Sequence, residues 1–177
     1  MTGCTNDRET QCNILFLLIF LQELADFEEM PHGPKLTVKD LEHDGFNCQP
    51  PSFLCQVAEV ASEPEKPLVG YALYFPIYST WEGKAMMLED LYVSPSMRGQ
   101  GVGERLFDAV AKEAVANGCS RLDFHVLEWN RARAFYERKG AQNLTQKEKW
   151  CYYRLSGDAL TRLPSNLGGV AGFMLYY

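Results

Sequence analysis

The feature that most restricts the fold is a glycine-rich run, Arg98-Gly99-Gln100-Gly101-Val102-Gly103, between a strand-like segment and a helix-like segment. The first turn of a helix has unpaired N–H groups and carries a partial positive charge. Glycines let the backbone in front of that turn approach a phosphate closely. The run therefore predicts a pyrophosphate-binding loop, and the strand–loop–helix–strand block over residues 85–127 is the part expected to bind a cofactor.

Three kinds of phosphate-binding loop are candidates. A P-loop would continue with Gly-Lys-Ser/Thr, but Gly103 is followed by Glu104. A dinucleotide-binding loop needs Gly-x-Gly-x-x-Gly, and Asp123 has the acid position of that motif. The glycines here are nevertheless spaced Gly-x-Gly-x-Gly, and three predicted strands precede them. The third pattern, Arg/Gln-x-x-Gly-x-Gly/Ala, fits Arg98, Gly101 and Gly103.

Hydrophobic periodicity and turn residues predict the elements around this loop. We expect helices over residues 14–29, 38–44, from the loop to about 117, and 130–139, and strands over 53–60, 68–77, 85–93, 121–127 and 150–155. Thr37 and Asp40 predict a capping box for the second helix, and Gly45 is expected to end it. This order predicts an α/β (α+β) domain with helices packed on a central sheet.

Composition narrows the class of protein further. A chain of 177 residues suits one domain. Its six cysteines form no Cys-x-x-Cys pair and only three histidines occur, so neither a metal site nor a disulfide framework is expected. Scattered thiols suggest a reducing compartment, hence a cytoplasmic location. The apolar run 14–21 has eight residues against the roughly 20 that span a bilayer, so we expect a buried helix and no membrane association.

Acidic residues are concentrated in one part of the chain. The net charge is -6, and residues 23–65 contain ten acids but only two lysines. Such a surface would attract a cationic partner and repel nucleic acid. The alternative is a solvated acidic face without a binding role.

With the loop assigned, several further motifs fall into the order of a known family. Leu88-Glu89-Asp90-Leu91-Tyr92-Val93-Ser94-Pro95, followed by the glycine-rich loop, resembles the central motif of the diamine acetyltransferases, which belong to the GNAT superfamily. This family includes spermidine/spermine and thialysine acetyltransferases. Similar segments are Glu23-Leu24-Ala25-Asp26-Phe27-Glu28, Asp44-Gly45-Phe46, Ile77-Tyr78-Ser79-Thr80-Trp81, Glu128-Trp129-Asn130 and Phe135-Tyr136-Glu137-Arg138-Lys139-Gly140-Ala141.

The resemblance covers roughly residues 20–160 of a single acetyltransferase domain over 1–177. The first 20 residues and the apolar tail 164–177 differ from the family, and Phe16, Ile19 and Phe20 replace polar or charged positions. The spacing from Asn130 to Tyr136 is one residue shorter than in the family.

The resemblance implies a GNAT-type acyl-CoA N-acyltransferase fold with a mixed central sheet. It implies a cytosolic homodimer that transfers acetyl from acetyl-CoA to a small cationic amine without a metal. Coenzyme contacts would fall on Leu91, Tyr92, Val93, Arg98, Gly99, Gln100, Gly101, Val102, Gly103, Glu104, Asn130 and Tyr136. Substrate contacts would fall on Phe27, Glu28, Ser79, Trp81, Glu89 and Glu148. Ser79-Thr80-Trp81 resembles the thialysine branch more than the polyamine branch.

Acetyl transfer to an amine requires a base, an oxyanion donor and a proton for the leaving thiolate. Glu89 lies in a predicted apolar strand, where an idle carboxylate would cost desolvation energy, so we expect it to accept the amine's proton through water. Asp90 should face the other side of the sheet and is the weaker candidate. The resemblance assigns the general acid to Tyr136, and the end of the strand near Val93 is expected to open and supply the oxyanion donor.

Two other functions remain open. A peptide or protein N-acetyltransferase would also use an acidic surface, to bind basic peptides. A catalytically weak relative that binds coenzyme or a partner protein would fit the unusual ends of the chain and the short spacing before Tyr136. Asn130 is expected to cap the helix that follows it, and in the resemblance its side chain reaches the pantetheine arm.

Overall fold

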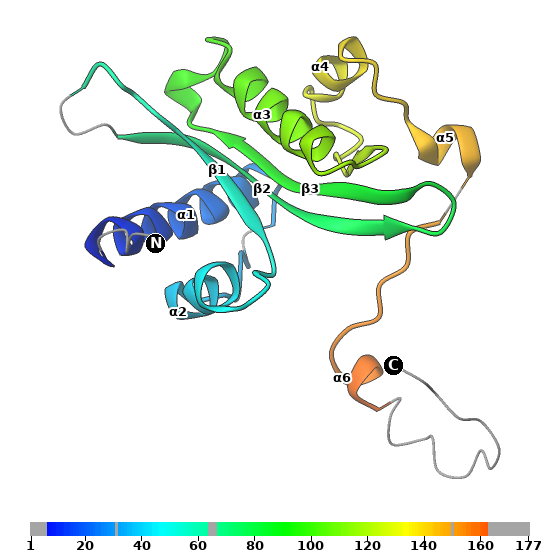
Figure 1. Cartoon of the computed structure of the whole chain (residues 1–177), viewed down its shortest axis with the longest axis horizontal. Coiled ribbons are helices and arrows are strands. Elements are labelled where there is room, and N and C mark those ends of the chain that lie inside the picture. The colour runs from blue at the N-terminus through cyan, green and yellow to red at the C-terminus, as the bar shows by residue number, and fades with distance from the viewer. Residues whose placement is uncertain (1–6, 31, 64–66, 150, 163–177) are drawn as a thin grey trace. The chain divides into compact units, whose positions relative to one another are not determined.

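The computed structural model describes residues 7–30, 32–63, 67–149 and 151–162, with side chains described from Ile14 onward. The chain divides into two compact units at Asn130, and each is described here by itself. The first unit contains the sheet and its main helices (Figure 1).

The central sheet has four strands in the order β1-β2-β3-β4. These are β1 (Leu54–Glu59), β2 (Leu68–Ser79), β3 (Gly83–Val93) and β4 (Leu122–Phe124). The first three are antiparallel, and β4 is parallel to β3. The expected mixed sheet is therefore confirmed.

Helices cover the two faces of this sheet (Figure 1). The helices α1 (Asp7–Phe27) and α2 (Val38–Glu42) lie on one face, and α3 (Val102–Ala116) lies on the other. Thr37 forms the predicted capping box with Asp40. Within the part of the chain that the structure describes, no helix combines the length and hydrophobicity needed to cross a bilayer.

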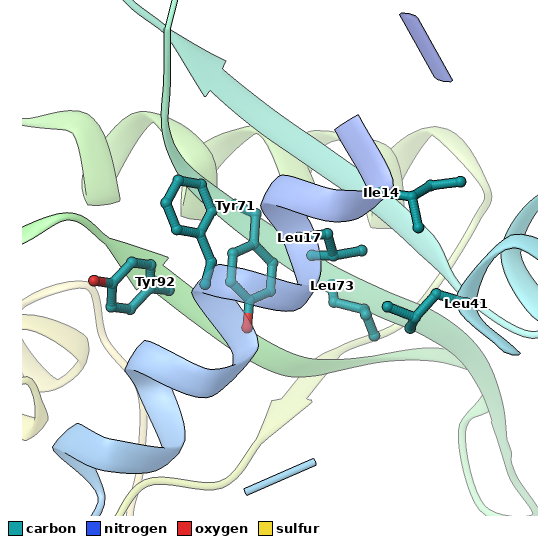
Figure 2. Packing of buried hydrophobic residues seen from close by; sticks show 7 residues of the cluster. Ile14, Leu17, Leu41, Tyr71, Leu73 and Tyr92 are labelled. Atoms are coloured by element: carbon teal, nitrogen blue, oxygen red, sulfur yellow. The ribbon is translucent and has the colours of Figure 1, made fainter. Parts of the chain in front are cut away.

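The α1 face is held by an apolar and aromatic core (Figure 2). Phe20 is buried and stacks on Tyr71 with ring centroids 6.2 Å apart, and it lies 5.4 Å from the ring of Tyr92. Burial of each such side chain contributes about 1.5–3 kcal/mol. Phe20 is thus a core residue, whereas Phe16 and Ile19 are exposed.

On the other face of the sheet, α3 packs closely on β2 at Gly70. A side chain at Gly70 would meet the backbone of Tyr92 at 2.6 Å and Leu106 of α3 at 3.3 Å. The helix buries Leu106, Phe107, Val110 and Ala114, as its periodicity predicts. It ends at Ala116, and Gly118 has the left-handed conformation expected of a C-terminal capping glycine.

Strand β3 contains a bulge that the sequence pattern does not indicate. Leu88 pairs with Tyr74 and Asp90 pairs with Leu73, so Glu89 is the extra residue. Because a bulge shifts the alternation of side chains by one residue, Leu88 shares the face of Tyr74, whereas Asp90 shares the face of Leu73 and Tyr71 in the α1 core.

Several predicted boundaries are wrong. The segment after α2 continues as a π-helical turn over His43–Asn47 instead of stopping at Gly45. Gly45 packs against Phe53, because a Cβ there would lie 2.5 Å from the Phe53 ring. The fourth strand is only three residues long, because its pairing with β3 ends at Leu88 and Phe124.

The second unit differs most from the predictions. Its helices are α4 (Arg133–Arg138), α5 (Leu144–Glu148) and α6 (Asp158–Thr161), and the last two are not expected from the sequence. No strand forms over 151–155, where Tyr152 and Tyr153 are largely exposed. Strand propensity reflects packing on a half-buried sheet, whereas Tyr153 is 87% exposed. Trp150 and the tail 164–177 lie outside the described residues.

Candidate active site

The sheet opens at the point where β3 approaches the glycine-rich loop. Parallel pairing with β4 ends at Leu88, but β3 continues to Val93. The last five residues of β3 therefore have an edge that β4 does not occupy. An opening was predicted near Val93, and it begins already beside the Glu89 bulge.

The loop itself has the backbone that a phosphate cradle requires. Gly99 and Gly101 have φ of 77° and 79°, a region that favours glycine. Apart from the glycine itself and its two chain neighbours, no described residue has an atom within 4 Å of the position that a Cβ would take at either glycine. The space in front of α3 is open, and the first helical hydrogen bond runs from Arg105 N–H to Gly101 O. The N–H groups of the first turn of α3, at residues 102–104, thus point toward the loop.

Other predicted loop residues differ in exposure. Gln100 is exposed, and its side-chain amide donates a hydrogen bond to Ser96 O at 3.1 Å. Val102 is buried in the start of α3, and Glu104 is exposed in the first turn. Gly103 lies against Val93, because a Cβ there would be 3.5 Å from the Val93 Cγ2 atom.

Arg98 holds this loop to the strand and to α1. Its Nε donates a hydrogen bond to Val93 O at 2.8 Å. Its guanidinium lies 5.1 Å from the ring centroid of Phe27 and 5.7 Å from that of Tyr92. Phe27, a predicted substrate contact, also packs on Trp129 at 5.7 Å. Arg98 and Phe27 thus hold the glycine-rich loop in place, a role that is not expected from the sequence.

The side chain of Tyr92 is part of the core. It is buried, and its hydroxyl donates a 2.5 Å hydrogen bond to Glu23 Oε2. Burial and the carboxylate of Glu23 raise the pKa of Tyr92 to about 12. The predicted coenzyme contact of Tyr92 can therefore be made by its backbone and not by its buried side chain. Leu91 and Val93, on either side of it, are half-buried.

A cavity of about 520 Å³, which is open to solvent, lies beside the bulge on the α1 face. It lies between the C-terminal part of α1, the segment that follows it, and β3. Its volume falls in the range of about 300–1,000 Å³ that is usual for small-molecule sites. Its lining includes apolar and charged side chains, among them Leu24, Glu28, Glu29, Met30, Lys35 and Asp90.

Asp90 is the perturbed carboxyl group of this cavity. Burial, and then the charge of Glu89, raise the pKa of Asp90 to about 6, although Tyr71 donates a 3.3 Å hydrogen bond to Asp90 Oδ2. Burial also raises the pKa of Glu28. A carboxyl group with a raised pKa in a cavity marks a functional-site candidate.

Glu89 is exposed at the bulge. The prediction that Glu89 is a buried carboxylate with a desolvation cost is therefore wrong. Asp90, the next residue, is the carboxyl group that has this cost. The bulge directs Asp90 toward the face of the α1 core. The sequence ranks Asp90 below Glu89 because no residue pattern indicates this bulge. The bulge does place Glu89 at the open edge of β3.

The predicted substrate residues Ser79 and Trp81 lie at the other end of β3. Ser79 Oγ accepts hydrogen bonds from the N–H groups of Trp81 and Glu82 at 3.3 and 3.2 Å. Trp81 is 84% exposed. The strand from Gly83 to Glu89 spans about 20 Å. Within one chain, this hairpin is therefore not brought to the cavity.

The remaining predicted residues lie at and beyond the boundary of the first unit. Asn130 is in a turn, where its N–H donates to Leu127 O at 2.9 Å. It does not cap α4, whose N-cap is Ala132, because the chain takes two further residues before the helix begins. Tyr136 in α4 is buried, and this burial raises its pKa to about 12. Glu148 is the exposed last residue of α5.

The described residues contain no group of three or more histidine, cysteine, aspartate or glutamate side chains arranged to hold a metal ion. The groups that come together at the opening of the sheet are carboxylates and backbone N–H groups. Such groups suit proton transfer, cation binding and phosphate binding.

Comparison with known proteins agrees with this geometry. Residues 18–141 match the acetyltransferase (GNAT) family. Thialysine N-epsilon-acetyltransferase of Bos taurus is 42% identical over 161 residues, covering 88% of this chain and 93% of the relative. Human spermidine/spermine N(1)-acetyltransferase-like protein 1 is 35% identical over 149 residues, which cover 81% of this chain but 21% of that protein.

Solved structures support the same fold. An integron cassette protein of V. cholerae, VCH_CASS6, is 27% identical, with a TM-score of 0.61 over 87% of this chain and 93% of that one. A probable acetyltransferase with 20% identity has a TM-score of 0.65 over 82% of this chain and 92% of its own. The fold and the enzyme class expected from the motifs are confirmed, and the chain belongs to the GNAT family of acetyltransferases.

Proposed function

We propose that this protein transfers the acetyl group of acetyl-CoA to the terminal primary amine of a small cationic acceptor of the thialysine or diamine type. The observation that carries the proposal is the acidic cavity at Asp90, which adjoins the Glu89 bulge on the strand that leads to the glycine-rich loop. A cation-binding cavity and a phosphate-binding loop on one strand suit an amine acceptor and a coenzyme donor.

The coenzyme would bind along the open edge of β3 and at the start of α3. Its pyrophosphate would accept hydrogen bonds from the N–H groups around Gly99 to Glu104. The backbone from Leu91 to Val93 would bind the pantetheine arm and supply the N–H for the oxyanion. We assign a contact with the same arm to Asn130.

Two side chains would move protons during the transfer. Glu89, exposed at the bulge, would take a proton from the acceptor ammonium through water, because only the neutral amine has a lone pair for attack. Tyr136 would give its proton to the departing thiolate. Its pKa of about 12 keeps the phenol protonated at neutral pH, as a general acid requires.

The acceptor would bind in the cavity with its reacting amine toward Glu89. Glu28 and Asp90 would attract its cationic groups. The name of the bovine relative and the Ser79-Thr80-Trp81 sequence favour thialysine-like acceptors, whereas the human relative's name supports polyamines. Glu148 is assigned a distal contact with longer acceptors.

We also infer that the protein works as a homodimer in the cytoplasm. Tyr78 and Trp81 are 76% and 84% exposed on the β2–β3 hairpin, a degree of exposure that suits aromatic side chains covered by a partner. The described cysteines Cys48, Cys55, Cys119 and Cys151 are free thiols, which suits a reducing compartment. Sedimentation equilibrium tests the dimer, and a monomer at micromolar concentration would contradict it.

The experiment that tests the function is an acceptor panel. The purified protein is given acetyl-CoA with thialysine, spermidine or a basic peptide, and product is measured by mass spectrometry. We expect acetylation of the two small amines and not of the peptide. Acetylation of the peptide alone would favour the peptide N-acetyltransferase alternative. Coenzyme binding without any product would favour a catalytically weak binding protein.

A further inference from the structure

The cavity beside Asp90 has charges of both signs. Its lining includes the carboxyl groups of Glu28, Glu29 and Asp90 and the ammonium group of Lys35. Apolar side chains such as Leu24 form another part of the lining. This composition differs from that of a site built only for polycations, which would have no reason to include a lysine.

The acidic side is suited to an ammonium group. Glu28 and Asp90 both line the cavity, and the charge of Glu28 makes the smallest contribution to the raised pKa of Asp90. Tyr71 donates a hydrogen bond to one oxygen of Asp90, Oδ2. An ammonium between Asp90 and Glu28 would relieve their repulsion and gain charge-assisted hydrogen bonds.

The basic side is suited to a carboxylate. Lys35 is exposed at the cavity and, within the described ranges, has neither a hydrogen bond nor an ion pair through its side chain. Although three acids line the same cavity, Lys35 is not paired with any of them in the described structure. Its ammonium is therefore available to an anionic group of a ligand.

We infer that this cavity binds the α-amino acid head group of the acceptor, with the α-ammonium at Asp90 and Glu28 and the α-carboxylate at Lys35. Lys35 is then the residue that selects ω-amino acids over plain diamines. A diamine has no carboxylate to bind Lys35, and its positive charge would be repelled by the lysine. Lys35 would therefore select by a favourable contact with the ω-amino acid and an unfavourable contact with the diamine. This inference rests on the proposed function and specifies its acceptor.

The test compares two acceptors that differ only in the carboxylate. Thialysine and its decarboxylated analogue, bis(2-aminoethyl) sulfide, are assayed with wild type and Lys35→Gln. The substitution should lower kcat/KM for thialysine about tenfold, the effect of one lost charge-assisted hydrogen bond. The kcat/KM for the analogue should stay the same or rise. Lys39→Gln is the matched control, because Lys39 is an exposed lysine of α2 that does not line the cavity.

An equal loss for both acceptors, or an unchanged value for thialysine, would overturn the assignment of Lys35. If the wild type acetylates neither acceptor, the proposed function fails. Calorimetric titration of thialysine into the protein then decides the inference separately. Binding that Lys35→Gln weakens about tenfold supports it, and equal affinity of both proteins, or no binding to the wild type, contradicts it.

Discussion

The two ends of β3 differ in how much of the surrounding structure converges on them. At the Val93 end, the strand leaves β4, Arg98 ties the loop to α1, and the acidic cavity adjoins the bulge. At the Gly83 end, Ser79 makes local hydrogen bonds, and Trp81 is largely exposed. Where several elements meet, their packing fixes the orientation of the groups that bind a ligand. The exposed hairpin can contribute to a binding site only if another molecule covers it.

Two glycines allow the two ends to be compared by experiment. Gly101 and Gly83 both have positive φ, of 79° and 84°. At either of them, a Cβ would meet no atom of the described residues within 4 Å, its chain neighbours aside. Gly101→Val should abolish acetyl-CoA binding, because a branched side chain would fill the space in front of α3. Gly83→Val introduces similar backbone strain but should leave acetyl-CoA affinity unchanged. Calorimetry on both folded variants measures this.

The outcome is informative in either direction. Equal loss of binding in both variants would mean that backbone strain, and not the position in the loop, is responsible. Unchanged affinity in Gly101→Val would show that the glycine-rich loop is not the coenzyme cradle. Circular dichroism spectra that match the wild type establish that each variant is folded.

A substitution at Tyr136 should affect kcat and not acetyl-CoA affinity, in contrast to Gly101→Val. The reason is that Tyr136 is assigned to the chemical step and not to binding. If its phenol protonates the thiolate, Tyr136→Phe should lower kcat by ~10²–10⁴ and leave acetyl-CoA affinity almost unchanged. Steady-state kinetics and calorimetry on the same preparation check both parts. A kcat within a few-fold of the wild type would show that water or another group supplies the proton.

Asp90 in β3 and Glu82 in the turn before β3 provide a comparison of carboxylates. The pKa of Asp90 is raised from 3.8 to about 6 in the folded protein. The native state therefore binds more protons than the unfolded state between these values, and the free energy of unfolding falls as pH rises from 4 to 6. Asp90→Asn removes this pH-dependent fall in the free energy of unfolding, because asparagine does not ionise. It should raise the free energy of unfolding by about 1–3 kcal/mol at pH 7.5 and have little effect at pH 4.

Glu82→Gln is the control at the hairpin end. Glu82 is exposed and pairs with Arg121 at 2.7 Å, and exposed ion pairs contribute about 0–1 kcal/mol. Urea unfolding of both variants at the two pH values measures the difference. A stabilisation by Asp90→Asn that is the same at pH 4 and pH 7.5 would show that ionisation of Asp90 is not its cause.

The smallest expected effect concerns the attraction of cationic acceptors. Residues 23–65 have ten acids against two lysines, so kcat/KM for spermine should fall a few-fold as salt rises from low to physiological concentration. Glu28→Gln should weaken this dependence and raise KM for spermine more than for thialysine, because spermine has more positive charges. A salt dependence that is absent in the wild type would contradict the steering.

The sequence predicts the first unit better than the second for a physical reason. The helix α3 and the strands β2 and β3 are long and periodic, and each buries a continuous face, so local pattern and packing agree. The segment 151–155 has aromatic residues typical of a strand, but a strand requires a partner, and Tyr153 is 87% exposed. Propensity alone does not specify pairing.

The site could be predicted in part. The loop around Gly101 is encoded locally, in glycines and a helix start, and its backbone has the predicted character. The role of Arg98 on Phe27 and the burial of Asp90 depend on contacts distant in sequence and on a bulge. Lys35 lies in a segment without periodicity, where no residue pattern indicates a cavity. The role proposed for Lys35 rests on the groups that line the cavity with it.

The proposed function requires that the Val93 end of β3 combines a coenzyme cradle with an amine site. Acetyl transfer from acetyl-CoA to thialysine by wild type, Gly83→Val and Gly101→Val, followed by mass spectrometry of the acceptor, measures both parts at once. We expect N-acetylated thialysine with the wild type and Gly83→Val and none with Gly101→Val. Product from Gly101→Val at the wild-type rate, or no product from the wild type, would show that this end of the strand does not have the proposed role.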